Sequence, residues 1–181
     1  GMVIKVCDFA TRQVLGQTER FPRWAMAIKF EAEEAITTVQ AVQWQVGRTG
    51  KLTPLALLEP VEICGATVKR ATLNNVGDIQ RKHVKIGGRV WIRRSNDVIP
   101  EIMGSVDDNG QEILPPEHCP FCGAEVVEKG AHLFCSNTVD CKPQLLAALA
   151  HFASKGCMDI QGLNEKTLET FMDQLGVRYP A

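Results

Sequence analysis

The sequence VQWQVGRTG, residues 42–50, decides the fold. Val42, Trp44 and Val46 alternate with two glutamines, a pattern that predicts a strand with one buried face. The glycines that frame residues 47–50 predict a turn at the end of this strand. An alternating strand that ends in such a turn indicates a chain that folds back on itself as β-structure.

The stretches around this strand and turn are also β-prone. Strand-like runs lie at residues 55–58, 61–63, 66–73, 84–86 and 89–94. Asn75 can cap a short helix before the last two runs. About five short strands between Ile36 and Val106, interrupted by one helix, are typical of a small closed barrel of the OB type. We therefore expect a mainly β fold with some α-helix.

Composition excludes two broad classes of protein. Hydrophobic residues make up 45% and charged residues 23% of the 181 residues, so wholesale disorder is excluded. No apolar run approaches the roughly 20 residues that cross a bilayer, and the N-terminus lacks a secretory signal. We expect no membrane association.

The most specific motif is Cys119-x2-Cys122-x12-Cys135-x5-Cys141. A two-residue gap lets one turn place two thiolates on an edge of a tetrahedron, and the second pair supplies the opposite edge. The residues between the pairs are too few and too polar to fold by burial alone, so we expect a structural Zn²⁺. His118 or His132 could replace a thiolate, although four cysteines already complete the shell. Two disulfides, or four thiols without a metal, are the alternative.

The other three cysteines, Cys7, Cys64 and Cys157, lie among apolar neighbours and are predicted to be small buried side chains. An odd total of seven, without a secretory signal, favours a reducing compartment over a disulfide framework. We therefore expect a cytoplasmic protein.

Two helices are predicted near the C-terminus. Apolar residues recur at helical spacing at Leu145, Leu149 and Phe152, and again at Leu168, Phe171, Met172 and Leu175. Gly162, in the connection between them, suits a residue with positive φ. Helix, glycine-containing turn and helix are typical of a helical hairpin.

The first thirty residues resemble the end of a domain. Strand-like runs at 2–6 and 24–30 flank a short helix that Asp8 can cap and Gly16 can close. Elements of this size cannot bury enough surface to stand alone, so we expect a piece cut from a longer protein. Lys5 and Lys29 each interrupt an apolar strand, where lysine is usually a surface residue, but two together suggest a pocket for an anion.

Positive charge is concentrated between residues 66 and 100, which hold eight basic residues and two acids within a chain of net charge −1. The basic residues are Lys69, Arg70, Arg81, Lys82, Lys85, Arg89, Arg93 and Arg94. The last two are adjacent on a strand and must face opposite ways, so one has to be partnered or to serve a site. Such a segment suits phosphate contacts, and a solvated charged face is the alternative.

Taken together, these residues resemble the NAD-dependent DNA ligases of bacteria. The motifs follow the family's order at residues 1–6, 22–25, 28–30, 46–50, 53–54, 71–75, 92–94, 97–100, 119–141, 151–154 and 158–163. The resemblance implies four parts: the end of the nucleotidyltransferase (adenylation) domain at 1–34, an OB-fold domain at 35–112, a zinc finger at 113–142, and the start of a helix-hairpin-helix domain at 143–181.

The family seals nicks in duplex DNA in replication and in repair of DNA damage, through enzyme-adenylate and DNA-adenylate intermediates, with NAD and Mg²⁺. The resemblance implies that Lys5 and Lys29 neutralise the adenylate phosphate. It also implies DNA contacts by Arg48, Thr49, Lys69, Arg70, Asn75, Arg93 and Arg94. The family's nucleophilic lysine, in Lys-x-Asp-Gly, is not in this sequence, so this part alone is not expected to ligate. The implied setting is a monomer on nicked duplex DNA, with NAD as cofactor, in the bacterial cytoplasm at the nucleoid.

The sequence departs from the family's pattern at a few positions. Glu31 replaces a proline, Ser95 and Asn96 replace an Ala-Gly pair, and Asn164 replaces a glycine. Asparagine tolerates positive φ better than most residues, so we expect the helical hairpin to persist. The Ser95-Asn96 pair leaves the turn before Asp97 less defined.

Two other functions fit part of the sequence. A non-catalytic OB and zinc-ribbon module would bind single strands by aromatic stacking. However, Trp44 and Trp91 alternate as core residues should, and there is one tyrosine. A zinc-stabilised scaffold for a protein partner leaves the basic segment unexplained. These observations favour backbone contacts to a duplex.

Overall fold

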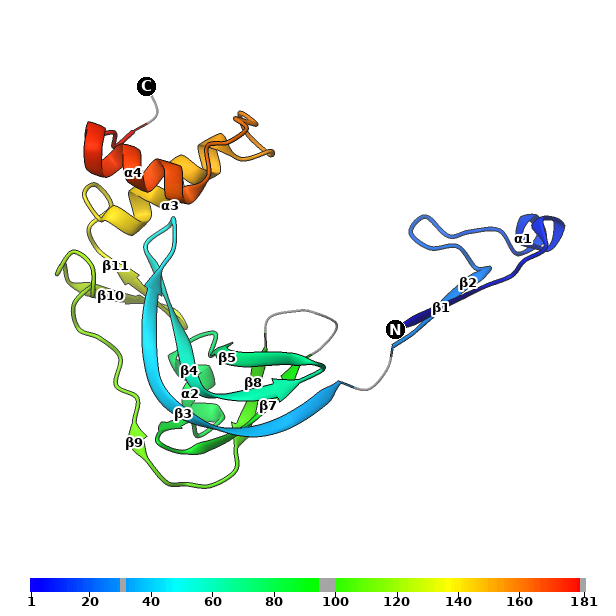
Figure 1. Ribbon diagram of the computed structural model, residues 1–181, viewed down its shortest axis with the longest axis horizontal. Coiled ribbons are helices and arrows are strands. Elements are labelled where there is room, and N and C mark those ends of the chain that lie inside the picture. The colour runs from blue at the N-terminus through cyan, green and yellow to red at the C-terminus, as the bar shows by residue number, and fades with distance from the viewer. Residues whose placement is uncertain (30–31, 95–99, 180–181) are drawn as a thin grey trace.

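A computed structural model describes residues 1–29, 32–94 and 100–179 of the chain (Figure 1). The strands are β1 (Met2–Lys5), β2 (Ala25–Ile28), β3 (Glu33–Val46), β4 (Lys51–Ile63), β5 (Ala66–Thr72), β6 (Lys85–Ile86), β7 (Arg89–Arg94), β8 (Glu101–Ser105), β9 (Gln111–Glu112), β10 (Val126–Lys129) and β11 (His132–Cys135). The helices are α1 (Phe9–Leu15), α2 (Val76–Arg81), α3 (Lys142–Ala153) and α4 (Glu165–Leu175). Within these ranges, every helix is too short or too polar to cross a membrane.

Five strands close into the predicted barrel, in the order β3, β4, β5, β8, β7 and back to β3. The β5–β8 pairing is parallel and the others are antiparallel. A register shift between Val39 and Ala41 lets the long strand β3 pair with β7 along its first half and with β4 along its second. This arrangement confirms the OB-type barrel.

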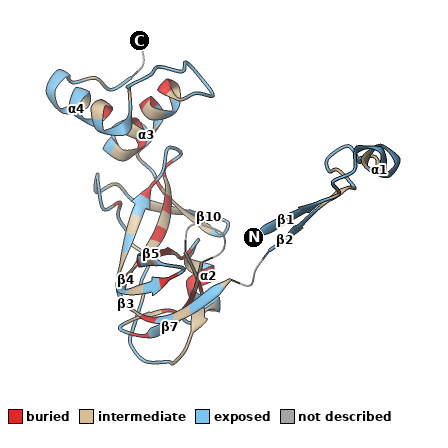
Figure 2. Ribbon diagram, turned by 45° about the vertical axis from the view of Figure 1, so that its right-hand side comes forward, coloured by how far each residue is buried: buried red, intermediate tan, exposed pale blue. Residues whose placement is uncertain are grey.

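The largest hydrophobic core lies inside this barrel, where Figure 2 shows buried residues on several strands. Its fully buried side chains include Val39, Leu73, Val90, Ile92 and Ile102. Helix α2 joins β5 to β6 and adds Ile79 to the same core. Apolar residues that alternate along the strands therefore fill the barrel, as the sequence predicted.

Three predicted helix ends are confirmed. Asp8 accepts a hydrogen bond from Thr11 N–H at 2.7 Å, and Asn75 accepts one from Asp78 N–H at 2.8 Å. Gly16 ends α1 with φ of 64°, and its N–H donates to the Arg12 carbonyl.

Two predictions of burial are wrong. Cys7, Cys64 and Cys157 are all exposed, because each lies in a connection between elements and not within a strand or helix that faces a core. Trp91 is 41% exposed because its strand neighbours Val90 and Ile92 occupy the inner face of β7.

The N-terminal segment, residues 1–29, has no core of its own. Strands β1 and β2 form an antiparallel ribbon that leads to α1, and Figure 1 shows this segment apart from the barrel. None of its residues is buried. The segment therefore presents apolar side chains such as Val3 and Phe9 to solvent.

The C-terminal helices α3 and α4 contact each other, and Leu149 and Leu168 are buried. Gly162, in their connection, has φ of 81°, as predicted. Asn164 does not need the positive φ that we expected it to tolerate. Its φ is −84°, and its side chain caps α4 by accepting a hydrogen bond from Thr167 N–H at 3.0 Å. The departures at Glu31, Ser95 and Asn96, and the turn before Asp97, lie outside the described residues.

Candidate nucleic-acid interface and metal centre

The four cysteines of the predicted metal motif come together in space. The Sγ atoms of Cys119, Cys122, Cys135 and Cys141 all lie within 4.8 Å of one another. Cys119 and Cys141 are separated by 4.0 Å between sulfurs, and Cys122 and Cys135 by 3.5 Å. All four are free thiols, so the two-disulfide alternative is not what the structure contains.

Local structure explains how these sulfurs converge. Cys119 and Cys122 lie in a tight turn in which Gly123 N–H donates to the Cys119 carbonyl at 2.9 Å. Cys135 ends β11, and Cys141 is the residue that precedes the first turn of α3. One tight turn therefore supplies the first pair of sulfurs, and a strand end and a helix start supply the second pair.

The cluster fits a tetrahedral metal. Metal–sulfur bonds of about 2.3 Å give sulfur–sulfur edges of about 3.8 Å, close to the separations seen here. Burial raises the pKa of the Cys135 and Cys141 thiols, so a dication is what would favour four thiolates at this place. The donor set is therefore compatible with Zn²⁺ held at four sulfurs, with no position left open for water.

The finger is joined to the barrel by backbone pairing. Strand β11 extends the barrel sheet by pairing with the start of β4, Leu133 opposite Leu52 and Phe134 opposite Lys51. Cys135 N–H donates to the Gly50 carbonyl at 2.9 Å. A cysteine of the metal cluster thus contacts the predicted turn at residues 47–50 directly.

That turn carries two of the predicted DNA-binding residues. Arg48 and Thr49 are exposed between β3 and β4, whereas Gly50 is buried. Gly50 has φ of 79°, and a Cβ there would lie 3.1 Å from the Cys135 carbonyl oxygen. Only glycine suits this position, so the turn is held firmly while Arg48 points into solvent.

Strand β5 carries the next two predicted residues, and the pairing of Arg70 with Leu57 places Arg70 on the outer face of β4 and β5. Lys69 and Arg70 are exposed on β5, and Arg70 lies opposite Leu57 of β4. Like Arg48, neither makes an ion pair with any residue that the structure describes. In OB barrels this face and the first interstrand turn are the common place for nucleic-acid contacts.

Arg93 and Arg94 face opposite sides of β7, as predicted for adjacent strand residues. Arg94 donates to the Ile63 carbonyl at 3.5 Å, so it is the partnered member of the pair. Arg93 lies opposite Glu34 of β3 and Glu101 of β8.

The basic segment does not form one free positive face. Four of its cations are paired with acids: Arg81 with Asp78, Lys82 with Asp78 and Glu101, Lys85 with Asp108, and Arg89 with Asp107. Three of these acids, Glu101, Asp107 and Asp108, follow the basic segment in the sequence but lie beside it in the fold. The eight basic residues and two acids of residues 66–100 give that segment a net charge of +6, which therefore overstates its free positive charge.

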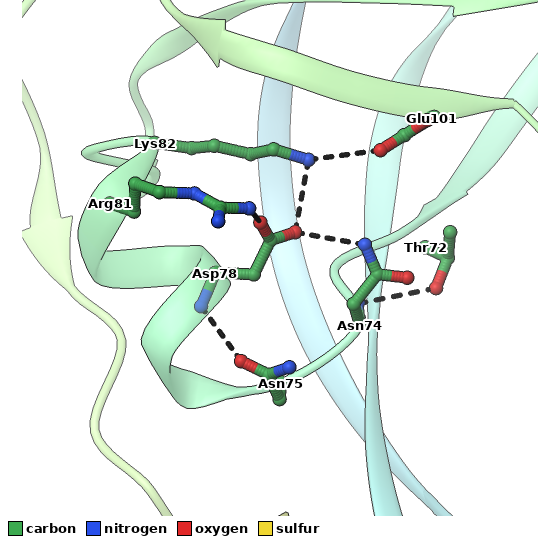
Figure 3. A network of polar contacts seen from close by, with 7 residues as sticks. All are labelled: Thr72, Asn74, Asn75, Asp78, Arg81, Lys82 and Glu101. Carbon is green, nitrogen blue, oxygen red and sulfur yellow. Dashed lines mark hydrogen bonds and ion pairs between the residues drawn. The ribbon is translucent and has the colours of Figure 1, made fainter. Parts of the chain in front are cut away.

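A buried carboxylate organises the end of the barrel near α2 (Figure 3). Asp78 is 4% exposed and accepts hydrogen bonds from Asn74 Nδ2 at 3.0 Å and from Arg81. Lys82 Nζ lies 2.9 Å from Asp78 and 3.2 Å from Glu101 of β8. Burial alone would raise the pKa of Asp78, but the hydrogen bonds from Lys82 and Asn74 outweigh it and lower the pKa.

Asn75, another predicted DNA contact, lies within this network. Its side-chain oxygen accepts the cap hydrogen bond of α2, and its amide nitrogen is the group that could donate to a ligand. Asn74 precedes it with φ of 56°. The pair therefore has a structural role whatever else it contacts.

Lys5 and Lys29, the predicted phosphate ligands, lie at opposite ends of the β1–β2 ribbon. Lys5 pairs with Ala25, and Lys29 follows the pair of Met2 with Ile28. Their positions in the register place both on one face, separated by four residues, or about 13 Å. Both are exposed.

Sequence patterns did not single out three residues near the metal cluster, Lys51, Lys129 and Phe134, and a fourth, His132, was considered only as a substitute metal ligand. The β10–β11 hairpin brings the last three beside Lys51 of β4. The signal that could have revealed the hairpin is the strand-like runs at 126–129 and 132–135 on either side of Gly130, which has φ of 61°.

Comparisons with known proteins agree with this architecture. Residues 36–112 match the model of the NAD-dependent DNA ligase OB-fold domain, and residues 1–33 match that of the NAD-dependent DNA ligase adenylation domain. A DNA ligase from Alkaliphilus metalliredigens is 58% identical over 98% of this chain, and one from Alkaliphilus oremlandii is 60% identical over 98%. A DNA ligase from Clostridium botulinum is 55% identical over the same share.

The chain spans about a quarter of these relatives, 27% of the length of each. The two matched models describe neighbouring domains of one kind of protein, and they occur here in adjacent positions. The chain belongs to the NAD-dependent DNA ligase family.

Proposed function

We propose that this chain is part of an enzyme that uses NAD to seal nicks in duplex DNA, and that this part grips the duplex and holds a structural zinc. The observation that carries the proposal is the match of its first two parts to adjacent ligase domain models. The same proposal divides the chain into four parts, with boundaries at residues 34, 112 and 142. It also includes a role in replication and repair, dependence on Mg²⁺, and a monomer in the bacterial cytoplasm.

The duplex contact is assigned to the β3–β4 turn and the outer face of β4 and β5. Arg48 and Thr49 at the turn and Lys69 and Arg70 on β5 are exposed. Cations on a rigid sheet suit the sugar-phosphate backbone, which has the same chemistry at every sequence. An enzyme that seals any nick needs this sequence-independent grip. Asn75, Arg93 and Arg94 remain weaker candidates because their side chains have structural neighbours.

Zinc would be held by Cys119, Cys122, Cys135 and Cys141. Bound there, Zn²⁺ supplies cross-linking of four thiolates and no catalytic chemistry. The contact from Cys135 N–H to the Gly50 carbonyl connects that cluster to the turn that carries Arg48. The metal would therefore position a DNA-binding residue as well as fold the finger.

Lys5 and Lys29 would neutralise the phosphate of the adenylate. Both lie on one face of the β1–β2 ribbon, and both are exposed where a neighbouring domain surface could complete a site. A pair of ammonium groups on an adenylate phosphate stabilises the charge that develops in phosphoryl transfer.

The activity is tested in the longer protein that contains this chain and the nucleophilic lysine. We expect it to seal a nicked duplex with NAD and not with ATP. Lys29→Ala should abolish most of this activity, whereas Lys155→Ala, a change at another exposed lysine, should not. Sealing with ATP alone, or normal sealing by the Lys29 variant, would contradict the proposal.

One observation favours a second function, binding of single strands. The exposed Trp91 offers a surface on which a base could stack. A direct comparison of a single strand and a duplex of equal length decides between the two. Tighter binding of the single strand, lost in Trp91→Ala, would replace the duplex assignment.

A further inference from the structure

The β10–β11 hairpin of the finger is continuous with the barrel sheet. Its strands lie beside the start of β4, so β10, β11, β4 and β3 form four neighbouring strands (Figure 1). Directly paired residues point to the same side of a sheet, so the register sorts this region into two faces. The strand pairings therefore decide which side chains share a surface.

One of these faces is closed. Leu52 pairs with Leu133 and with Val46, and Cys135 pairs with Val126. Val46, Leu52 and Cys135 pack in a core with the other buried cysteines. This side of the hairpin faces the metal cluster.

The other face is open and basic. It carries Gln45 on β3, Lys51 and Thr53 on β4, His132 and Phe134 on β11, and Lys129 on β10, as their pairings show. The one acid of the hairpin strands, Glu128, pairs with Leu133 and so belongs to the opposite face. Within residues 43–46, 51–53, 126–129 and 132–135, no carboxylate shares the open face.

The cations of this face lack acidic partners. Neither Lys51 nor Lys129 makes an ion pair with a residue in the described ranges. Lys129 Nζ lies 5.6 Å from the centre of the Phe134 ring, and Lys51 Nζ lies 3.3 Å from His132 Nε2. The Nδ1 atom of His132 is buried and has no hydrogen-bond partner among the described residues.

The open face continues onto the surface assigned to DNA. Lys51, Thr53, Leu55 and Leu57 alternate with buried residues along β4, and Leu57 lies opposite Arg70. Lys51 also follows the turn that carries Arg48. The backbones of Lys51 and Lys129 are two strands apart, about 10 Å across the sheet, so neighbouring phosphates of one backbone are within reach of both.

We propose that the finger hairpin extends the duplex-binding face, with Lys129 and Lys51 contacting phosphates of the same duplex that Arg48 contacts. The inference rests on the proposed duplex-binding function and assigns the finger a direct role in binding. The occupant is the phosphate backbone because its uniform negative charge complements a face with cations and no carboxylate.

The test is duplex affinity as a function of salt for Lys129→Gln. One lost phosphate contact should lower affinity about eightfold near 0.1 M salt and reduce the slope of log K against log salt by about 0.9. Lys129→Arg should retain both, because it keeps the charge. Equal zinc content and circular dichroism should show that each variant is folded.

Glu128→Gln is the matched control, since it changes the charge of the same hairpin by one on the opposite face. Affinity within about twofold of the parent supports a local contact. A gain as large as the Lys129→Gln loss would indicate long-range charge alone and would overturn the proposal.

Arg48→Ala separates this inference from the proposed function. If Arg48→Ala weakens binding while Lys129→Gln leaves affinity and slope unchanged, the hairpin contact is wrong and the barrel contact stands. If the parent chain does not bind duplex DNA, both are wrong.

Discussion

The barrel and the finger reach an ordered structure by different means. The barrel closes over a continuous apolar core to which five strands and α2 contribute. In the finger, residues 113–142, the buried residues are Cys119, Cys135 and Cys141 and no others. Hydrophobic burial therefore explains the barrel, whereas the finger depends on its sulfurs and on the barrel end that Val46 and Leu52 provide.

Removal of the metal should give the largest loss of stability, and it should destabilise the finger but not the barrel. Binding of a structural zinc contributes on the order of 10 kcal/mol to the folded form. We expect one zinc per chain, and after chelation we expect amide exchange to become fast in residues 113–142 and at the 47–50 turn. Barrel amides such as that of Ile92 should stay protected.

Cys141→Ser should reproduce the effect of chelation, and Cys64→Ser, which changes an exposed thiol, should not. Equal loss of protection in barrel and finger would show that the two regions do not differ as described.

A cavity in the barrel should give the next largest effect. Ile92 is fully buried, so Ile92→Ala should lower the free energy of unfolding by about 2–5 kcal/mol in urea titrations. Trp91→Ala, at the next position on the outer face, should cost much less although it removes a larger side chain. A larger loss of stability in Trp91→Ala than in Ile92→Ala would indicate that Trp91 packs in the core.

The network of polar contacts around Asp78 of α2 should contribute less to stability than the barrel core, and its contribution should depend on pH. Asp78→Asn keeps the shape but removes the charge, and should cost about 1–3 kcal/mol at pH 7. Because the folded state lowers the pKa of Asp78, its contribution is present above the ordinary carboxyl pKa and is lost as pH falls below about 4.

Acid titration of stability checks this sign. The parent should lose more stability than Asp78→Asn between pH 5 and pH 2, where carboxylates protonate. Asp159→Asn, a change at an exposed carboxylate, should follow the parent. Parallel curves for the parent and Asp78→Asn would mean that the network does not hold a charged carboxylate.

The sequence predicted the local features of both regions and missed their long-range contacts. Alternation at residues 42–46, the Asn75 cap and the cysteine spacing are signals within a few residues, and each is confirmed. Pairing of β11 with β4 joins residues about eighty positions apart, and no local pattern specifies it. For the same reason the sequence did not predict that Lys85 is paired, because its partner Asp108 lies outside the basic segment of residues 66–100.

Burial was harder to predict for single side chains. Trp91 has the pattern of a strand residue, but alternation alone does not say which of two faces is the inner one. Cys64 follows a buried Ile63 yet begins the turn to β5 with φ of 51°. In both cases the course of the whole sheet decides, and that course depends on pairings outside the local window.

Arg48→Ala should give the smallest change in stability and a clear change in binding. The side chain is exposed, so unfolding should be unaffected, while duplex affinity should fall about eightfold near 0.1 M salt. Arg20→Ala, which removes a cation from the N-terminal segment, is the control. If both variants bind equally well, Arg48 does not contact DNA.

The most direct test of the central claim, that the barrel face and the finger together bind duplex backbone, is the salt dependence of duplex affinity for the zinc-loaded chain. With Arg48, Arg70, Lys51 and Lys129 in contact, log K should fall linearly with log salt with a slope of about −3 to −4. A slope near zero, or affinity that is unchanged after zinc is removed, would contradict it.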